Sequence, residues 1–178
     1  MQLIPIIPQA QFERERLRKN SPYQSIWEVL DEVKDPEIPV LSLWDMGVLR
    51  NVEQIEGETV VTITPTYSGC PAMDVMQEDI ENALKNAGIS PARVAVSLSP
   101  AWTTDWLSEK GRKAMHGFGI APPEAQAGDE TPLNGSPISC PQCESDNTEL
   151  VSEFGSTACK ALFRCNDCHE VFDYFKPL

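Results

Sequence analysis

Histidine, basic residues and long apolar runs are scarce in this chain of 178 residues. The two histidines, His116 and His169, and the absence of a Glu-x-x-His pair exclude a self-contained carboxylate–histidine di-iron centre. Lys and Arg number 14 against 27 Asp and Glu, which gives a net charge of −13. Because nucleic-acid binding depends on basic groups that neutralise phosphates, we expect no nucleic-acid partner. No apolar run reaches the ~18 residues of a membrane-spanning helix, so we expect no membrane association.

The N-terminal segment is apolar but is not typical of a secretory signal. Residues 1–8 contain two prolines and no basic residue, whereas a signal peptide begins with positive charge. The six cysteines include two motifs with metal-site spacing. Without an export signal, such cysteines indicate a reducing compartment, so we expect a cytoplasmic protein.

Two Cys-x-x-Cys motifs near the C-terminus are the strongest chemical signal. They pair Cys140 with Cys143 and Cys165 with Cys168. This spacing is typical of a closed four-thiolate metal site, since each motif turns tightly enough for both sulfurs to reach one ion. We predict a structural zinc in a ribbon-like module, with iron or an iron–sulfur cluster as the alternative.

Cys159 is a further sulfur near the second motif. Two interpretations of it stay open: a buried residue of the ribbon hairpin, or an exchangeable iron or cluster ligand.

The chain divides by composition into four segments. We predict an N-terminal solvated arm (1–20), a main domain (21–119), a proline-rich linker (120–138) and the four-cysteine module (139–178). In the main domain, apolar periodicity and turn residues predict helices over 22–35, 71–87 and 103–117, and strands over 48–55, 60–64 and 93–99. The first two strands flank Glu56-Gly57 and are expected to form a hairpin. One side of the second helix is expected to be apolar, through Met76, Ile80, Ala83, Leu84 and Ala87. The predicted fold class is therefore α+β, a two-layer helix-on-sheet domain of order helix-strand-strand-helix-strand-helix, with a small C-terminal zinc ribbon.

Cys70 is the candidate functional residue of the main domain. The segment 64–71 leaves a predicted strand through a turn and enters a predicted helix at Pro71. We therefore predict that Cys70 is the N-cap of this helix, where the positive end of the helix dipole would favour a thiolate. The alternative is a small buried residue at a tight turn. Asp35 and Glu37 lie in a loop stiffened by two prolines, and they are either site carboxylates or an ordinary charged turn at a helix end.

Three segments resemble a known family. Residues 35–40 (Asp-Pro-Glu-Ile-Pro-Val), 45–50 (Asp-Met-Gly-Val-Leu-Arg) and 64–71 (Thr-Pro-Thr-Tyr-Ser-Gly-Cys-Pro) are similar to the SufT-like domain of iron–sulfur cluster assembly factors, over about residues 22–105. With segments 100–106 and 153–162 added, the whole chain resembles the D-subunit family of bacterial phenylacetyl-CoA epoxidase systems.

The resemblance implies an accessory maturation factor and no enzyme activity. Its implied partners are the oxygenase and reductase components of the epoxidase, and its cargo is transient iron or an iron–sulfur cluster. Cys70 is implied as the functional thiol, supported by Asp35 and Glu37, and a second chain in a homodimer is one way to complete its ligand set. The alternatives are a rubredoxin-like electron-transfer subunit and a purely structural or regulatory subunit of the same complex.

Overall fold

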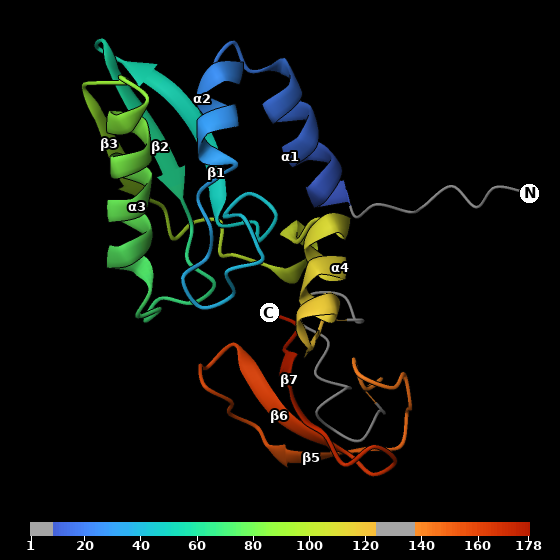
Figure 1. Cartoon of the computed structure of the whole chain (residues 1–178). Coiled ribbons are helices and arrows are strands. Elements are labelled where there is room, and N and C mark those ends of the chain that lie inside the picture. The colour runs from blue at the N-terminus through green and yellow to red at the C-terminus, as the bar shows by residue number, and fades with distance from the viewer. Residues whose placement is uncertain (1–8, 124–137) are drawn as a thin grey trace, which may run out of the picture. The chain divides into compact units, whose positions relative to one another are not determined.

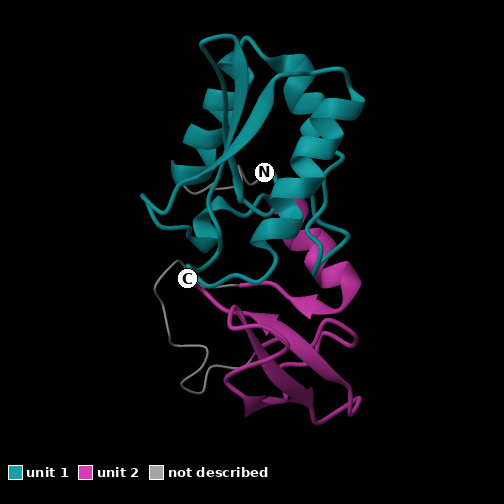
Figure 2. Ribbon diagram, turned by 90° about the vertical axis from the view of Figure 1, so that its left-hand side faces the viewer, with its two compact units in different colours: residues 1–108 teal, residues 109–178 magenta. Residues whose placement is uncertain are grey.

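A computed structural model of the chain describes residues 9–123 and 138–178. The apolar N-terminal segment 1–8 and residues 124–137 of the predicted linker lie outside the described residues. The chain forms two compact units, residues 1–108 and 109–178 (Figure 2). Within the described parts, no helix is both long and apolar enough to cross a membrane.

The first unit combines helices with a three-stranded sheet (Figure 1). Strand β2 lies at the centre, antiparallel to β1 and parallel to β3. The α+β fold class predicted from the sequence is confirmed. The elements are α1 (Gln9–Asn20), α2 (Gln24–Leu30), β1 (Leu49–Ile55), β2 (Glu58–Ile63), α3 (Met73–Asn86), β3 (Ala92–Val96) and a 3₁₀ turn, η1 (Thr104–Trp106).

The predicted hairpin joins β1 to β2. Its two central residues, Glu56 and Gly57, have φ of 53° and 84°, and Ile55 pairs with Glu58 across the turn. Two consecutive left-handed residues match the right-handed twist of the flanking strands, which explains why this short loop closes the hairpin.

Helix α3 is the crossover between the parallel strands β2 and β3, and it packs against β3 and α2 (Figure 1). Of its predicted apolar stripe, Met76, Ile80 and Leu84 are buried, whereas Ala83 is half-buried and Ala87, just beyond the helix, is exposed. The helix ends where Gly88 adopts φ of +75°, a left-handed conformation that glycine accepts without steric penalty.

The predicted solvated arm is wrong for residues 9–20, which form α1. Arg14 is buried in this helix and donates hydrogen bonds to the carbonyl oxygens of Trp44 (2.9 Å) and Leu49 (3.3 Å). The charged composition of the segment concealed the helix because its inward-facing residue is itself an arginine.

The start of α3 also differs from the prediction. Ala72 is the residue before the helix, so Cys70 does not cap it. The backbone N–H of Met73 instead bonds the carbonyl oxygen of Cys70 at 3.4 Å, which forms a turn ahead of α3. Pro71 therefore belongs to this turn.

The predicted helix over 103–117 is divided into η1 and α4 (Glu109–Phe118). Between them, the Ser108 N–H bonds the carbonyl oxygen of Asp45 at 2.9 Å, and the Ser108 hydroxyl bonds its carboxylate at 2.7 Å. These bonds to a distant loop interrupt the helix, and α4 belongs to the second unit.

The second unit contains α4 and a four-stranded sheet of order β4-β7-β6-β5. Its strands are β4 (Ile120–Ala121), β5 (Thr148–Ser152), β6 (Lys160–Cys165) and β7 (Val171–Phe175). Strand β4 pairs with β7, so residues 120–121 are part of the sheet and not of the predicted linker. Phe163, Phe172 and Tyr174 are in the core of this unit, whereas Phe154 is 65% exposed.

Candidate metal centre and thiol loop

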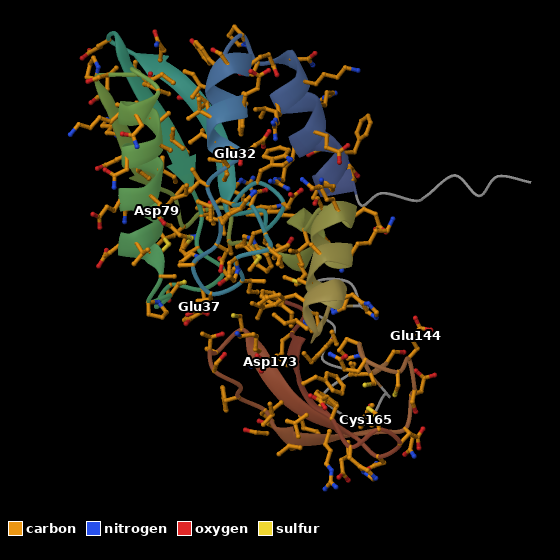
Figure 3. The ribbon with its side chains drawn as sticks, in the orientation of Figure 1. Glu32, Glu37, Asp79, Glu144, Cys165 and Asp173 are labelled. Atoms are coloured by element: carbon orange, nitrogen blue, oxygen red, sulfur yellow. The ribbon has the colours of Figure 1, made fainter. Side chains whose placement is uncertain are left out.

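The four cysteines of the two motifs come together in the second unit. Their sulfurs all lie within 4.8 Å of one another, which makes Cys140, Cys143, Cys165 and Cys168 a metal-binding group. The first cysteine of each motif is buried and the second is exposed. Cys165 ends β6, so the sheet positions one half of the group (Figure 3).

Each motif is followed by a residue with left-handed backbone. Glu144 after the first motif has φ of 61°, and His169 after the second has φ of 66°. The N–H of Glu144 bonds the carbonyl oxygen of Cys140, and the N–H of Cys165 bonds that of Glu170, both at 2.8 Å. Positive φ is uncommon outside glycine. Its occurrence directly after both motifs indicates that each Cys-x-x-Cys motif ends in a similar tight turn, which brings its two sulfurs to the same side.

Asp167, inside the second motif, connects the two halves of the group. Its carboxylate accepts a hydrogen bond from the Asn147 amide at 2.8 Å and another from the Ser145 hydroxyl. These bonds lower the pKa of Asp167, with the Ser145 bond as the largest cause. Sequence analysis missed this carboxylate, although a polar residue at an inner position of a Cys-x-x-Cys turn is the signal that could have indicated it.

Electrostatics distinguish the sulfurs. The pKa of the Cys165 thiol is lowered to about 7. The largest cause is the hydrogen bond from the backbone N–H of Cys168, and the N–H of Asp167 acts in the same direction, whereas desolvation opposes both. The pKa of the Cys143 thiol is instead raised to about 12. The N–H of Ser145 favours its thiolate, but the hydrogen bond with the Cys168 thiol, desolvation and the other two sulfurs together outweigh this effect. Four neighbouring thiols cannot all ionise unaided, and a cation bound among them would displace their protons.

The sulfur spacing fits a single tetrahedral ion. Sγ of Cys140 lies 3.7 Å from that of Cys168, and Sγ of Cys143 lies 3.6 Å from that of Cys165. Metal–sulfur bonds of about 2.3 Å give tetrahedral sulfur separations of about 3.8 Å. The donor set is closed, because four thiolates complete a tetrahedral shell.

Cys159 is not one of the clustered ligands. It is buried just before β6, and its sulfur lies 3.0 Å from the Thr157 hydroxyl. Its backbone carbonyl accepts a hydrogen bond from Lys176 at 2.9 Å. Whether this thiol also exchanges iron stays a prediction.

Cys70 lies half-buried in the loop between β2 and α3. Its N–H bonds the carbonyl oxygen of Tyr67 at 3.2 Å, which closes a tight turn around Gly69. The loop from Thr64 to Ser68, with Leu98 and Trp102, lines a cavity of about 140 Å³. The predicted thiol therefore lies on a structured loop, two residues beyond the stretch that lines this cavity, and Cys70 is not itself a lining residue.

Asp35 is buried and organises the loop in which it lies. Its Oδ1 accepts hydrogen bonds from the N–H groups of Glu37 (2.9 Å) and Ile38 (2.8 Å), and its own N–H bonds the Leu41 carbonyl oxygen. This arrangement is an Asx turn, which fixes the loop. Glu37, by contrast, is exposed (Figure 3).

The two predicted carboxylates thus have different surroundings. Asp35 and Pro36 line a cavity of about 460 Å³ whose other wall includes Asp79 and Asn82 of α3. Cys70 precedes the start of α3, whereas these residues lie one to three turns into it. The predicted proximity of Cys70 to Asp35 and Glu37 stays a prediction.

Comparison with known families divides the chain in the same two parts. Residues 23–98 match the family model for iron–sulfur cluster assembly proteins. Residues 124–176 match the model of the PaaD zinc beta ribbon domain.

Two relatives in sequence agree with these matches. A protein of Escherichia coli K12, provisionally named as the D component of 1,2-phenylacetyl-CoA epoxidase, is 47% identical over 91% of this chain and 98% of its own length. An Fe-S protein maturation auxiliary factor of Porphyromonas gingivalis is 34% identical over 49% of this chain and 84% of its own length. A solved domain of unknown function from Bacillus anthracis shares 22% identity with a TM-score of 0.48 over 58% of this chain and 95% of its own. The chain belongs to the family of phenylacetyl-CoA epoxidase D subunits, built from an iron–sulfur cluster assembly domain and a zinc ribbon.

Proposed function

We propose that this protein is an accessory maturation factor of a multicomponent phenylacetyl-CoA epoxidase. The main support for the proposal is that one chain contains both an iron–sulfur cluster assembly domain and the zinc ribbon of the D-subunit family. The chain assists insertion of iron or an iron–sulfur cluster into the oxygenase or its reductase, and it does not catalyse the epoxidation.

Cys70 is the residue that holds the cargo. A transfer factor needs a ligand that binds and then releases a soft metal, and a thiol on a surface loop meets that need better than a closed four-thiolate cage. Its half-buried position on the loop between β2 and α3 supports this role. A single thiol leaves coordination positions that a client protein, a second copy of the chain or a carboxylate would fill.

The two carboxylates take different parts in this proposal. Asp35 positions its loop through two backbone hydrogen bonds. Glu37 is exposed and is the carboxylate that can reach a cargo ion or a client surface.

Zinc is the metal we assign to the four-cysteine group, where it has a structural role. A closed thiolate tetrahedron leaves no open position for chemistry, and sulfurs so close together suit one ion better than a cluster, whose thiolates bind different irons. None of the six cysteines, all in the described part of the chain, forms a disulfide, which supports a reducing and therefore cytoplasmic compartment.

The proposal is tested by producing the oxygenase and reductase components in cells with and without this protein. We expect equal amounts of both components, with reduced iron or cluster content in its absence. Components that are fully metallated without this protein would refute a maturation role.

Electron transfer is the second candidate function. The exposed sulfurs of Cys143 and Cys168 would give an iron ion in the four-cysteine group electronic access to the surface. An iron tetrathiolate is red and a zinc one is colourless, so the absorption spectrum of the purified protein distinguishes the two. Stimulation of turnover when the protein is added to fully metallated epoxidase would favour this second function.

A further inference from the structure

A third cavity of the first unit is lined by two arginines. It has a volume of about 380 Å³, and its walls come from α1, from the start of β1 and from the segment before and within η1. The side chains that matter are Glu13 and Arg14 of α1, Arg50 of β1, and Pro100 with Trp106. This cavity shares no lining residue with those near Cys70 or Asp35.

Arg14 is held in place by backbone carbonyl groups and not by a carboxylate. Its guanidinium donates to the carbonyl oxygens of Trp106, Trp44 and Leu49, and its Nε is buried without a hydrogen-bond partner. The Gln11 amide oxygen also accepts from it at 2.7 Å. Among the described residues Arg14 forms no ion pair, and the more distant charges of Glu15 and Asp45 offset only part of its positive charge.

Arg50 is the arginine whose donors are available. It is half-buried, and its guanidinium carbon lies 3.2 Å from the ring centroid of Trp106. One terminal nitrogen is buried with no acceptor, and no ion pair within the described parts of the chain involves this side chain. A guanidinium stacked on an aromatic ring is fixed in orientation, which leaves its N–H fork directed edgewise.

The two charges affect each other. Burial, and next the charge of Arg50, lower the pKa of Arg14 to about 9, and burial lowers that of Arg50. Glu13 lines the same cavity, but its carboxylate accepts a hydrogen bond from the Gln9 amide and lies beyond ion-pair distance of both arginines. An anion in the cavity would compensate positive charge that the described protein groups leave unpaired.

We propose that this cavity is a binding site for an oxyanion, a carboxylate or phosphate group of a small ligand, with Arg50 as the residue that binds it. The fork of Arg50 matches the paired oxygens of either group, and such charge-assisted pairs are among the stronger hydrogen bonds in proteins. Arg14 adds positive potential, while Trp106 and Pro100 provide apolar contact for the carbon part of the ligand.

The site is tested by titrating the full chain with inorganic phosphate and, separately, with succinate, at constant ionic strength set with chloride. The readouts are the Arg50 side-chain Nε–H and Trp106 indole N–H signals in ¹H–¹⁵N NMR spectra. A saturable shift of both signals is expected with at least one anion. Saturation by phosphate alone assigns a phosphate ligand, and saturation by succinate alone assigns a carboxylate ligand. Absence of a saturable shift with both anions overturns the proposal.

Arg50→Gln should weaken binding about tenfold, the loss expected for one charge-assisted hydrogen bond. Arg93→Gln is the matched control, because Arg93 is an exposed strand arginine that pairs with Glu58 at 3.0 Å, and it should leave the affinity unchanged. Equal weakening by both variants would show non-specific attraction and overturn the site. If Arg50→Gln fails to fold, Arg50→Lys replaces it, since an ammonium lacks the fork. Unchanged affinity in the folded variant also overturns the proposal.

Discussion

Arg14 donates a hydrogen bond of 2.9 Å to the carbonyl oxygen of Trp44 while its guanidinium carbon lies 4.2 Å from the centroid of the same residue's ring. One side chain thus makes both a polar and a cation–π contact with the loop before β1. Since Arg18 also stacks on that ring, at 4.8 Å, α1 is an integral part of the first unit.

We predict that Arg14→Leu lowers the free energy of unfolding by roughly 3 kcal/mol, because it leaves buried carbonyl oxygens without donors. Urea denaturation of the full chain, followed by tryptophan fluorescence, measures the change. Arg16→Leu, an exposed position on the same helix, is the control and should change stability by less than about 0.5 kcal/mol. Equal effects of the two substitutions would mean that α1 is only loosely attached.

Gly47 gives a second test of the packing around Trp106. A Cβ at this position would lie 2.7 Å from the Trp106 Cβ, and the backbone has φ of +83°. Gly57 has nearly the same φ, +84°, but nothing within 4 Å of its added Cβ. Gly47→Ala should therefore destabilise by roughly 3 kcal/mol and Gly57→Ala by about 1 kcal/mol. Thermal unfolding of both variants isolates the steric contribution, and equal losses would contradict the close contact.

Much of the fold could be predicted because its signals are local. The left-handed pair Glu56 and Gly57 closes a hairpin, the stripe from Met76 to Leu84 repeats with helical period, and the four cysteines occur at metal-site spacing. Each of these patterns is complete within a short stretch of chain.

The features that were missed depend on contacts between distant residues. Nothing near Arg14 in sequence shows that its partners are carbonyl groups 30 to 92 positions away. In the same way, the break between η1 and α4 comes from Ser108 bonding to Asp45, 63 residues earlier. The prediction of Cys70 as a helix cap was wrong because an additional turn precedes α3, a boundary shift that propensity alone does not resolve.

Loss of the metal should unfold only the ribbon. We predict one zinc per chain, and Cys143→Ser should abolish stoichiometric metal binding, because a hydroxyl is a poor replacement for a thiolate ligand. Elemental analysis measures the metal, and NMR spectra should show lost dispersion for the ribbon strands β5, β6 and β7 only. Cys159→Ser is the matched control and should retain full metal, since its sulfur is outside the cluster. Metal loss in both variants would mean that Cys159 is also a ligand.

The Asp35 loop allows structure and function to be separated. Asp35→Ala removes the acceptor of two backbone N–H groups and should lower stability by about 2 kcal/mol, whereas Asp35→Asn retains an acceptor oxygen and should lose less. Glu37→Gln should leave stability unchanged, because its side chain is exposed. Denaturant unfolding supplies these values. A strong loss of epoxidase metallation in Glu37→Gln without loss of stability would assign Glu37 to the transfer step.

Cys70→Ala is the decisive substitution for the proposed function. Its chain should fold normally and keep its ribbon metal, since the side chain is only half-buried and lies outside the four-cysteine group. Cells that produce it should nevertheless contain oxygenase and reductase with iron or cluster content near that of the deletion, because alanine cannot hold soft iron. Metal analysis of the purified components is the measurement, and cells that produce the unaltered chain are the reference. Normal metallation with Cys70→Ala would exclude this thiol as the cargo ligand, while leaving an accessory role through other residues to be tested with the deletion alone.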